Sequence, residues 1–124
     1  MAAKRAAKTS INPDRSLKVI SGFVADKSAG DFYRLLNDRV RLGILSSLAV
    51  SDRLSFTELK TLLGATDGNL SVHARKLEGA GYIACEKKFE GRIPRTEFSI
   101  TGKGRKSLNR YLKHMEALIK VTSG

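Results

Sequence analysis

The chain has 124 residues, of which 23 are Lys or Arg and 12 are Asp or Glu, giving a formal net charge of +11 and a pI near 10.2. This length predicts one domain with a modest core, and the positive charge indicates an anionic partner: nucleic acid, an acidic membrane surface or an acidic protein. A single cysteine excludes an intramolecular disulfide framework, and no stretch reaches the roughly 18 apolar residues of a membrane span, so we expect a cytoplasmic protein that does not bind membranes.

Residues 1–28 are expected to form a basic, flexible arm ahead of a single domain at 29–124. The first fifteen residues carry four cations and one acid with almost no large apolar groups, a composition typical of disorder. Such an arm is either a solvated tail or an element that follows DNA phosphates or enters the minor groove. Five apolar residues between Leu17 and Val24 match neither a helical nor a strand period, so both conformations stay open there.

Helical spacing of apolar residues begins at Asp31 and continues to Val50. Asp38 interrupts the pattern, and aspartate is a residue type that caps helix N-termini. The sequence therefore predicts two helices, at 31–37 and 38–50, or one helix kinked at the same point.

A short helix is predicted at 56–63, preceded by a minimal strand at 53–55. Ser55 and Glu58 have the spacing of a capping box, in which the hydroxyl accepts from the third amide of the helix and the carboxylate reaches back to the cap. Gly64 is a stop signal at the other end. The side chains expected to be buried are those of Phe56, Leu59, Leu62 and Leu63.

A second helix follows at 67–79, and the two together form a helix-turn-helix motif. Leu70, Ala74 and Leu77 lie on one helical face, and Asp67 is in position to cap the helix. The opposite face carries short hydrogen-bonding groups, one small apolar group and two cations, which suit base edges and phosphates. We therefore predict a DNA recognition helix whose contacting residues are Asn69, Ser71, Val72, Arg75 and Lys76.

Two strands are predicted next, YIACEKK at 82–88 and TEFSI at 96–100, with a loop at 89–95. Pro94 has no backbone donor and is expected in the loop, not in a paired strand. A hairpin directly after a helix-turn-helix is a wing, and its cations can lie beside the DNA backbone or in the minor groove. The expected contacts of the wing are Lys88, Arg92 and Arg95.

A long C-terminal helix is predicted at about 101–120. It carries an apolar stripe that continues beyond what a compact winged domain needs to cover, and this length favours a homodimer. The alternative is that the stripe folds back onto the chain's own core. The residues expected in the dimer interface are Phe32, Leu35, Leu36, Leu108, Tyr111, Leu112, Met115, Leu118 and Ile119.

Five segments in this order, VRLGILSSL, FTELKTLLG, DGNLSVHARKLEGAGYI, EGRIPRTEFSIT and GKGR, resemble the winged helix-turn-helix transcriptional regulators related to the MarR and ArsR families. The resemblance covers about residues 31–119. It implies an α+β, mainly α, fold with a small antiparallel β-wing and a long C-terminal helix. It also implies a prokaryotic repressor that binds pseudo-palindromic operator DNA as a homodimer, with the helix at 67–79 in the major groove and the wing at 87–96 alongside. His73 matches a position that is often histidine in ArsR-like proteins, and we expect it to pack or to contact a phosphate.

No cofactor, metal or catalytic site is expected. Metal-sensing ArsR proteins carry clustered cysteines or His/acid pairs, whereas this chain has one cysteine and two histidines, His73 and His114, far apart in sequence. No triad, phosphate-binding glycine loop or carboxylate pair indicates an enzyme. Alternation along its strand points Cys85 inward, which predicts a structural thiol. A small-molecule effector is possible for the family but not indicated here, because typical MarR proteins house it in a longer helical region.

The main alternative function is a winged-helix module that binds proteins or RNA without operator specificity. RNA recognition favours exposed aromatic side chains for base stacking. The eight aromatic residues of this chain lie mostly on apolar stripes, and both the helix and the wing carry cations, so double-stranded DNA is the favoured partner.

Overall fold

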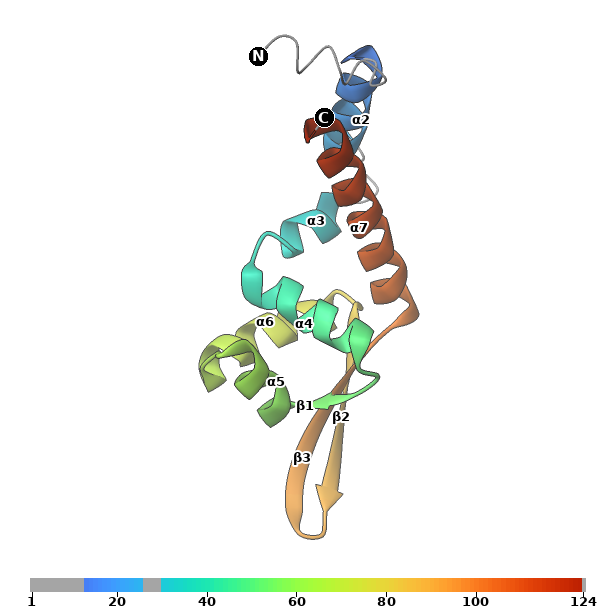
Figure 1. Cartoon of the computed structure of the whole chain (residues 1–124). Helices are drawn as coiled ribbons and strands as arrows, with labels where there is room; N and C mark the ends of the chain where they lie inside the picture. Colours follow the sequence, from blue (N-terminus) through green and yellow to red (C-terminus); the bar gives the residue numbers. More distant parts are fainter. Residues whose placement is uncertain (1–12, 26–29, 124) are drawn as a thin grey trace.

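The computed structural model describes residues 13–25 and 30–123 of the chain. Within them, helices and one three-stranded antiparallel sheet form a mainly helical α+β fold, as the sequence predicts. Figure 1 shows the hairpin β2–β3 projecting from one end of the helical body, while α7 leaves the body in the opposite direction beside α2. The elements are α2 (Pro13–Ala25), α3 (Gly30–Leu35), α4 (Arg39–Val50), β1 (Leu54–Ser55), α5 (Phe56–Leu63), α6 (Asp67–Gly79), β2 (Ile83–Glu90), β3 (Ile93–Ile100) and α7 (Gly102–Thr122).

One apolar core joins the helices to the base of the sheet. Its side chains come from every element between α3 and α7 except β1, and burying each large one contributes about 1.5–3 kcal/mol to folding. The predicted seam of α6 is confirmed, since its three residues are almost fully buried. The fully buried large side chains are Ile44, Leu45, Leu48, Leu59, Leu70, Leu77, Ile83 and Leu108.

Caps separate the helices largely where the sequence places them. Asp38 has extended backbone and accepts from the amides of Val40 and Arg41 at 2.8 and 3.2 Å, so α3 and α4 are two helices. The capping box of α5 and the left-handed glycine at its end, with φ +62°, are also confirmed. One predicted burial is wrong: Leu62 is exposed, because α4 covers the side of α5 that carries Leu59 and Leu63.

The predicted cap of α6 is wrong by one residue. Thr66, not Asp67, has extended backbone and accepts from the amide of Asn69 at 3.1 Å. Asp67 is instead the first helical residue and pairs with Lys60 of α5 at 2.8 Å. A carboxylate in the first turn still stabilises the helix through the macrodipole, so both acceptors favour the start of α6.

The Asp38 cap gives a prediction about stability and pH. Burial acts to raise the pKa of Asp38, but hydrogen bonds from the amides of Arg41 and Val40, together with the charges of His73 and Arg41, outweigh it and leave the pKa below its ordinary value. Asp38→Ala is therefore expected to lower the free energy of unfolding by about 1 kcal/mol at neutral pH. Because the folded-state pKa is the lower one, this contribution is present above the ordinary carboxyl pKa and is lost as the pH falls through the folded value.

Urea denaturation of Asp38→Ala across the acidic range measures this effect. Asp38→Asn is the matched control, because asparagine caps helices about as well as aspartate but carries no titrating charge. An Asn variant as unstable as the Ala variant at pH 7 would show that the charge, not the cap, stabilises α4.

The sheet has the order β1–β3–β2, with β2 and β3 paired along their whole length. The predicted loop at 89–95 is wrong in extent: only Gly91, with φ +67°, and Arg92 form the turn. Pro94 lies in β3 opposite Phe89. A proline is tolerated there because β1 pairs with β3 only at residues 97 and 98, which leaves the other side of the strand open at residue 94.

Helix α2 decides between the two conformations left open for residues 17–24. It packs on α7, and its Phe23 ring stacks on Tyr33 with ring centroids 5.1 Å apart and meets the His114 ring edge-on at 5.5 Å. Residues 17–24 are therefore helical and do not form an extended arm. The other parts of the predicted arm, at 1–12 and 26–28, lie outside the described residues.

Candidate nucleic-acid interface

The polar face of α6 is open to solvent. Asn69, Arg75 and Lys76 are exposed, Ser71 is half-buried, and 51% of Val72 is accessible. Neither Arg75 nor Lys76 forms an ion pair with another described residue. Because the buried seam fixes the helix on the core, this face presents two cations, two short polar groups and one methyl-rich group in a defined geometry.

His73 does not belong to this open face. Its side chain is only 13% exposed, with Nδ1 at 2.9 Å from a guanidinium nitrogen of Arg41 and Nε2 at 3.6 Å from Asp38. Since the guanidinium can only donate, Nδ1 acts as the acceptor in this contact. The packing role anticipated for His73 fits this arrangement, in which it ties the middle of α6 to the start of α4, and we leave it out of the DNA-contacting set.

The C-terminal end of α6 is held by the first turn of α7. The ammonium of Lys103 donates to the carbonyl of Ala80 at 2.9 Å and lies 4.7 Å from the centroid of the Tyr82 ring. Thr101 donates its hydroxyl to the carbonyl of Gly81 at 2.7 Å and its amide to the carbonyl of Tyr82 at 3.1 Å. A cation at the carbonyl end of a helix is favoured by the macrodipole, so this contact fixes α6 relative to α7.

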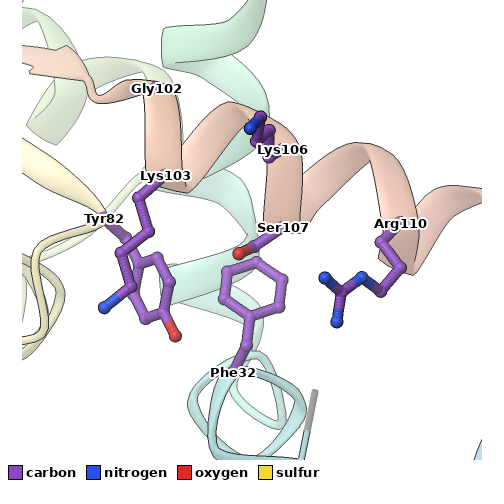
Figure 2. Close-up of a pocket in the computed structure, with 7 residues that line it drawn as sticks. All are labelled: Phe32, Tyr82, Gly102, Lys103, Lys106, Ser107 and Arg110. Carbon is purple, nitrogen blue, oxygen red and sulfur yellow. The ribbon is translucent and has the colours of Figure 1, made fainter. Parts of the chain in front are cut away.

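A cavity of about 580 Å³ adjoins this contact between α7 and the rings of Phe32 and Tyr82. Figure 2 shows Lys103 extending along Tyr82, with Ser107 above Phe32 and Arg110 at the far side. Both rings are almost fully buried, with centroids 4.7 Å apart. Phe32 therefore belongs to the connection between α3 and the base of the sheet.

The cations predicted to contact DNA from the wing differ in whether they form ion pairs with acids of the chain. Arg92 lies exposed in the turn and pairs with no described acid. Lys88 is 3.5 Å from Glu86 and 3.4 Å from Glu97, and Arg95 is 3.2–3.4 Å from Glu58, Glu90 and Glu97. Burial acts to raise the pKa of Glu97, but hydrogen bonds from Arg95 and Lys88 outweigh it and lower that pKa, so the carboxylate stays charged.

The residues predicted for the dimer interface differ in how exposed they are in the structure. Phe32, Leu36 and Leu108 are wrong as partner contacts, because 5% or less of each is exposed and they already fill the chain's own core. Leu35 and Tyr111 pack against that core and are partly buried. The exposed apolar side chains along α7 and α2 are those of Leu112, Ile119, Leu17, Ile20 and Val24, while Met115 and Leu118 are half-buried.

Cys85 is a half-buried free thiol on the inward face of β2. Burial raises its pKa, and the charge of Glu78 raises it further against the opposing effect of Lys87. A thiol with a raised pKa is a poor nucleophile.

Among residues 13–25 and 30–123 the side chains form no group that could hold a metal ion, and the helices include none long and apolar enough to span a bilayer.

A family model described as a winged helix DNA-binding domain matches residues 40–119. The chain belongs to this winged helix family. A relative, an uncharacterized protein of Methanocaldococcus jannaschii, is 36% identical over 88 residues, which cover 70% of this chain and 95% of that protein.

Solved structures share the winged helix fold. A transcriptional regulator homologue from Pyrococcus horikoshii OT3 superposes with a TM-score of 0.69 at 29% identity, over 83% of this chain and 95% of that one. Bacillus subtilis PadR in complex with operator DNA gives 0.55 at 20% identity, over 60% and 48%. MarR gives 0.62 at 21% identity over 86% and 80%, and an ArsR family regulator gives 0.52 at 20% over 71% and 86%. The resemblance to MarR and ArsR regulators is confirmed, and the fold is that of DNA-binding transcription regulators.

Proposed function

We propose that this protein is a sequence-specific transcriptional regulator, acting as a repressor in the cytoplasm, that binds double-stranded operator DNA as a homodimer. The observation that carries the proposal is the open polar face of α6, whose two cations have no described acid as partner. The PadR structure supports it, because a protein of the same fold is there bound to operator DNA. In this arrangement α6 enters the major groove, and the wing lies along the backbone or in the minor groove.

Each residue of the α6 face has a chemical role in this proposal. Asn69 can make a bidentate contact to adenine, and Arg75 can make one to guanine. Ser71 can donate to or accept from a base edge or a phosphate, whereas Val72 suits the thymine methyl group. Lys76 is a point charge suited to a phosphate. Arg92 at the tip of the wing suits the minor groove, where the negative potential is strongest.

The exposed apolar side chains of α2 and α7 support the homodimer. Leu112 and Ile119 are 49% and 62% exposed on a helix that leaves the helical body, and Leu17 and Val24 of α2 are exposed as well. Apolar surface of this kind is favourable to bury against an identical copy. A two-fold dimer would present two α6 helices to half-sites about 34–36 Å apart, which is why the proposed operator is pseudo-palindromic.

Asn69→Ala and Arg75→Ala test the proposal. Each is expected to cost about 1–3 kcal/mol of affinity for the operator and to relax preference at one base pair, because a bidentate base contact is lost. A pool of random-sequence duplexes selected on the wild-type protein supplies the operator, and binding titrations at several salt concentrations measure the affinities.

Arg34→Ala serves as the control for charge, since Arg34 is exposed on α3 and already pairs with Asp31. Equal losses on the operator and on random DNA for the two α6 variants would contradict base reading by α6. Affinity that does not fall with salt would contradict phosphate contact altogether and would favour a protein-binding module.

A further inference from the structure

The wing has two chemically different faces, and two neighbouring lysines lie on opposite ones. Successive side chains of a strand point to opposite sides of a sheet. The register places Lys87 opposite Thr96 and Lys88 opposite Arg95. Lys87 therefore shares a face with Cys85 and Phe98, and Lys88 shares the other face with Glu86 and Glu97.

The face of Lys88 is an ion-pair network. Glu86 and Glu97 are bridged by Lys88 at 3.5 and 3.4 Å and by Arg53 at 3.1 and 3.8 Å. Arg95 adds contacts to Glu97, Glu90 and Glu58, and the last of these connects the wing to the first turn of α5. Three cations face four acids in this network, so it has no net positive charge to offer a phosphate.

The face of Lys87 continues the side of the sheet that packs on α6. At its base Ile83 is buried in the core, and β2 contacts α6 along this side. Cys85 is half-buried, and from Lys87 outward the face is open to solvent. Lys87 pairs with no described acid, and two residues further along Phe89 is 73% exposed. Lys87 is therefore an exposed cation on the sheet face whose base is buried in the core.

We propose that Lys87 is the phosphate-binding residue of the wing stem. Lys88 and Arg95 are positioning residues: Lys88 joins β2 to β3, and Arg95 holds the wing against α5. This inference rests on the proposed function and states which cation of the wing binds a DNA phosphate. A cation without a partner acid releases a condensed counterion from DNA when it meets a phosphate. A cation already neutralised by two or three carboxylates must give up those pairs first, so its net contribution to binding is small.

Lys87→Ala and Lys88→Ala test the inference as a matched pair. The two substitutions remove the same charge at adjacent positions, so the long-range field of the protein changes equally in both variants. The probe is a mixed-sequence duplex, with affinity measured over a series of salt concentrations. Lys87→Ala is expected to reduce the slope of log affinity against log salt by about 1, whereas Lys88→Ala is expected to leave it unchanged.

Thermal denaturation of both variants completes the experiment. Lys88→Ala is expected to lower the melting temperature more than Lys87→Ala, because only Lys88 takes part in ion pairs. Wild-type binding together with an unchanged slope for Lys87→Ala, or an equal loss of slope in both variants, would overturn this inference alone. A wild-type protein that binds no duplex in a salt-dependent manner would overturn the proposed function and this inference with it.

Discussion

Gly104→Ala is expected to destabilise the fold by about 3 kcal/mol or more, at a helical position where alanine would ordinarily be the better residue. A Cβ at residue 104 would lie 2.1 Å from the carbonyl oxygen of Tyr82 and 3.0 Å from Cγ1 of Ile100. The first of these is a backbone atom that also accepts from the amide of Thr101 at 3.1 Å. The clash can be relieved only by moving α7 away from the segment that joins α6 to β2.

Equilibrium unfolding in urea measures the loss, and Gly102→Ala is the control. Gly102 lies in the same turn of α7, but a Cβ there would meet nothing within 4 Å. Alanine at residue 102 is therefore expected to be neutral or to stabilise the protein by a few tenths of a kcal/mol through helix propensity. Two variants of equal stability would mean that α7 does not pack closely on the carbonyl of Tyr82.

Local signals in the sequence account for most of the fold. The capping box at Ser55 and Glu58, the cap at Asp38 and the glycine at residue 64 each depend on residues at most four apart, and all three are confirmed. The seam of α6 needs only helical spacing. Each of these features is formed by residues close together in the sequence, so it could be placed without tertiary information.

The features that sequence reasoning missed depend on contacts between distant segments. Pro94 is a breaker in a paired strand, but it is tolerated in β3 because β1 is too short to reach it. The conformation of α2 stayed open, and the ring contacts that hold Phe23 of this helix join it to Tyr33 and His114, some ten and ninety positions away. The cap of α6 was missed for a different reason: two adjacent residues, Thr66 and Asp67, are both of types that cap helices, and Thr66 takes the role.

The candidate site shows the same division. The polar face of α6 follows from its buried seam, because a helix has only one other side to present. Which cations of the wing are free could not be predicted from the sequence. Lys88 and Arg95 are neutralised by acids from β2, β3 and α5 that only folding brings together. Strand alternation from the inward Cys85 was the signal that would have singled out Lys87. The contact of Lys103 with Ala80 had no signal in the sequence beyond the GKGR segment.

The dimer is the part of the proposal with the largest expected effect on DNA binding. Ile119→Asp is expected to yield a monomer and to weaken operator binding by about 10²–10⁴-fold, because the second half-site contact is then no longer intramolecular. A folding defect is not expected, since 62% of Ile119 is exposed in the protomer and the substitution removes little buried area. Sedimentation velocity and operator titration on the same preparation measure the two effects.

Lys120→Ala is the control for this variant, because both substitutions lower the net charge by one at adjacent positions, and Lys120 is exposed beside the apolar stripe. It is expected to stay dimeric and to keep nearly all of its operator affinity. A single half-site duplex separates the two possible causes of any loss. Ile119→Asp should bind it as well as the wild-type protein, since α6 and the wing are untouched. If the Asp variant is dimeric, α7 is not the interface; if it is monomeric but binds the full operator normally, one protomer is sufficient for recognition.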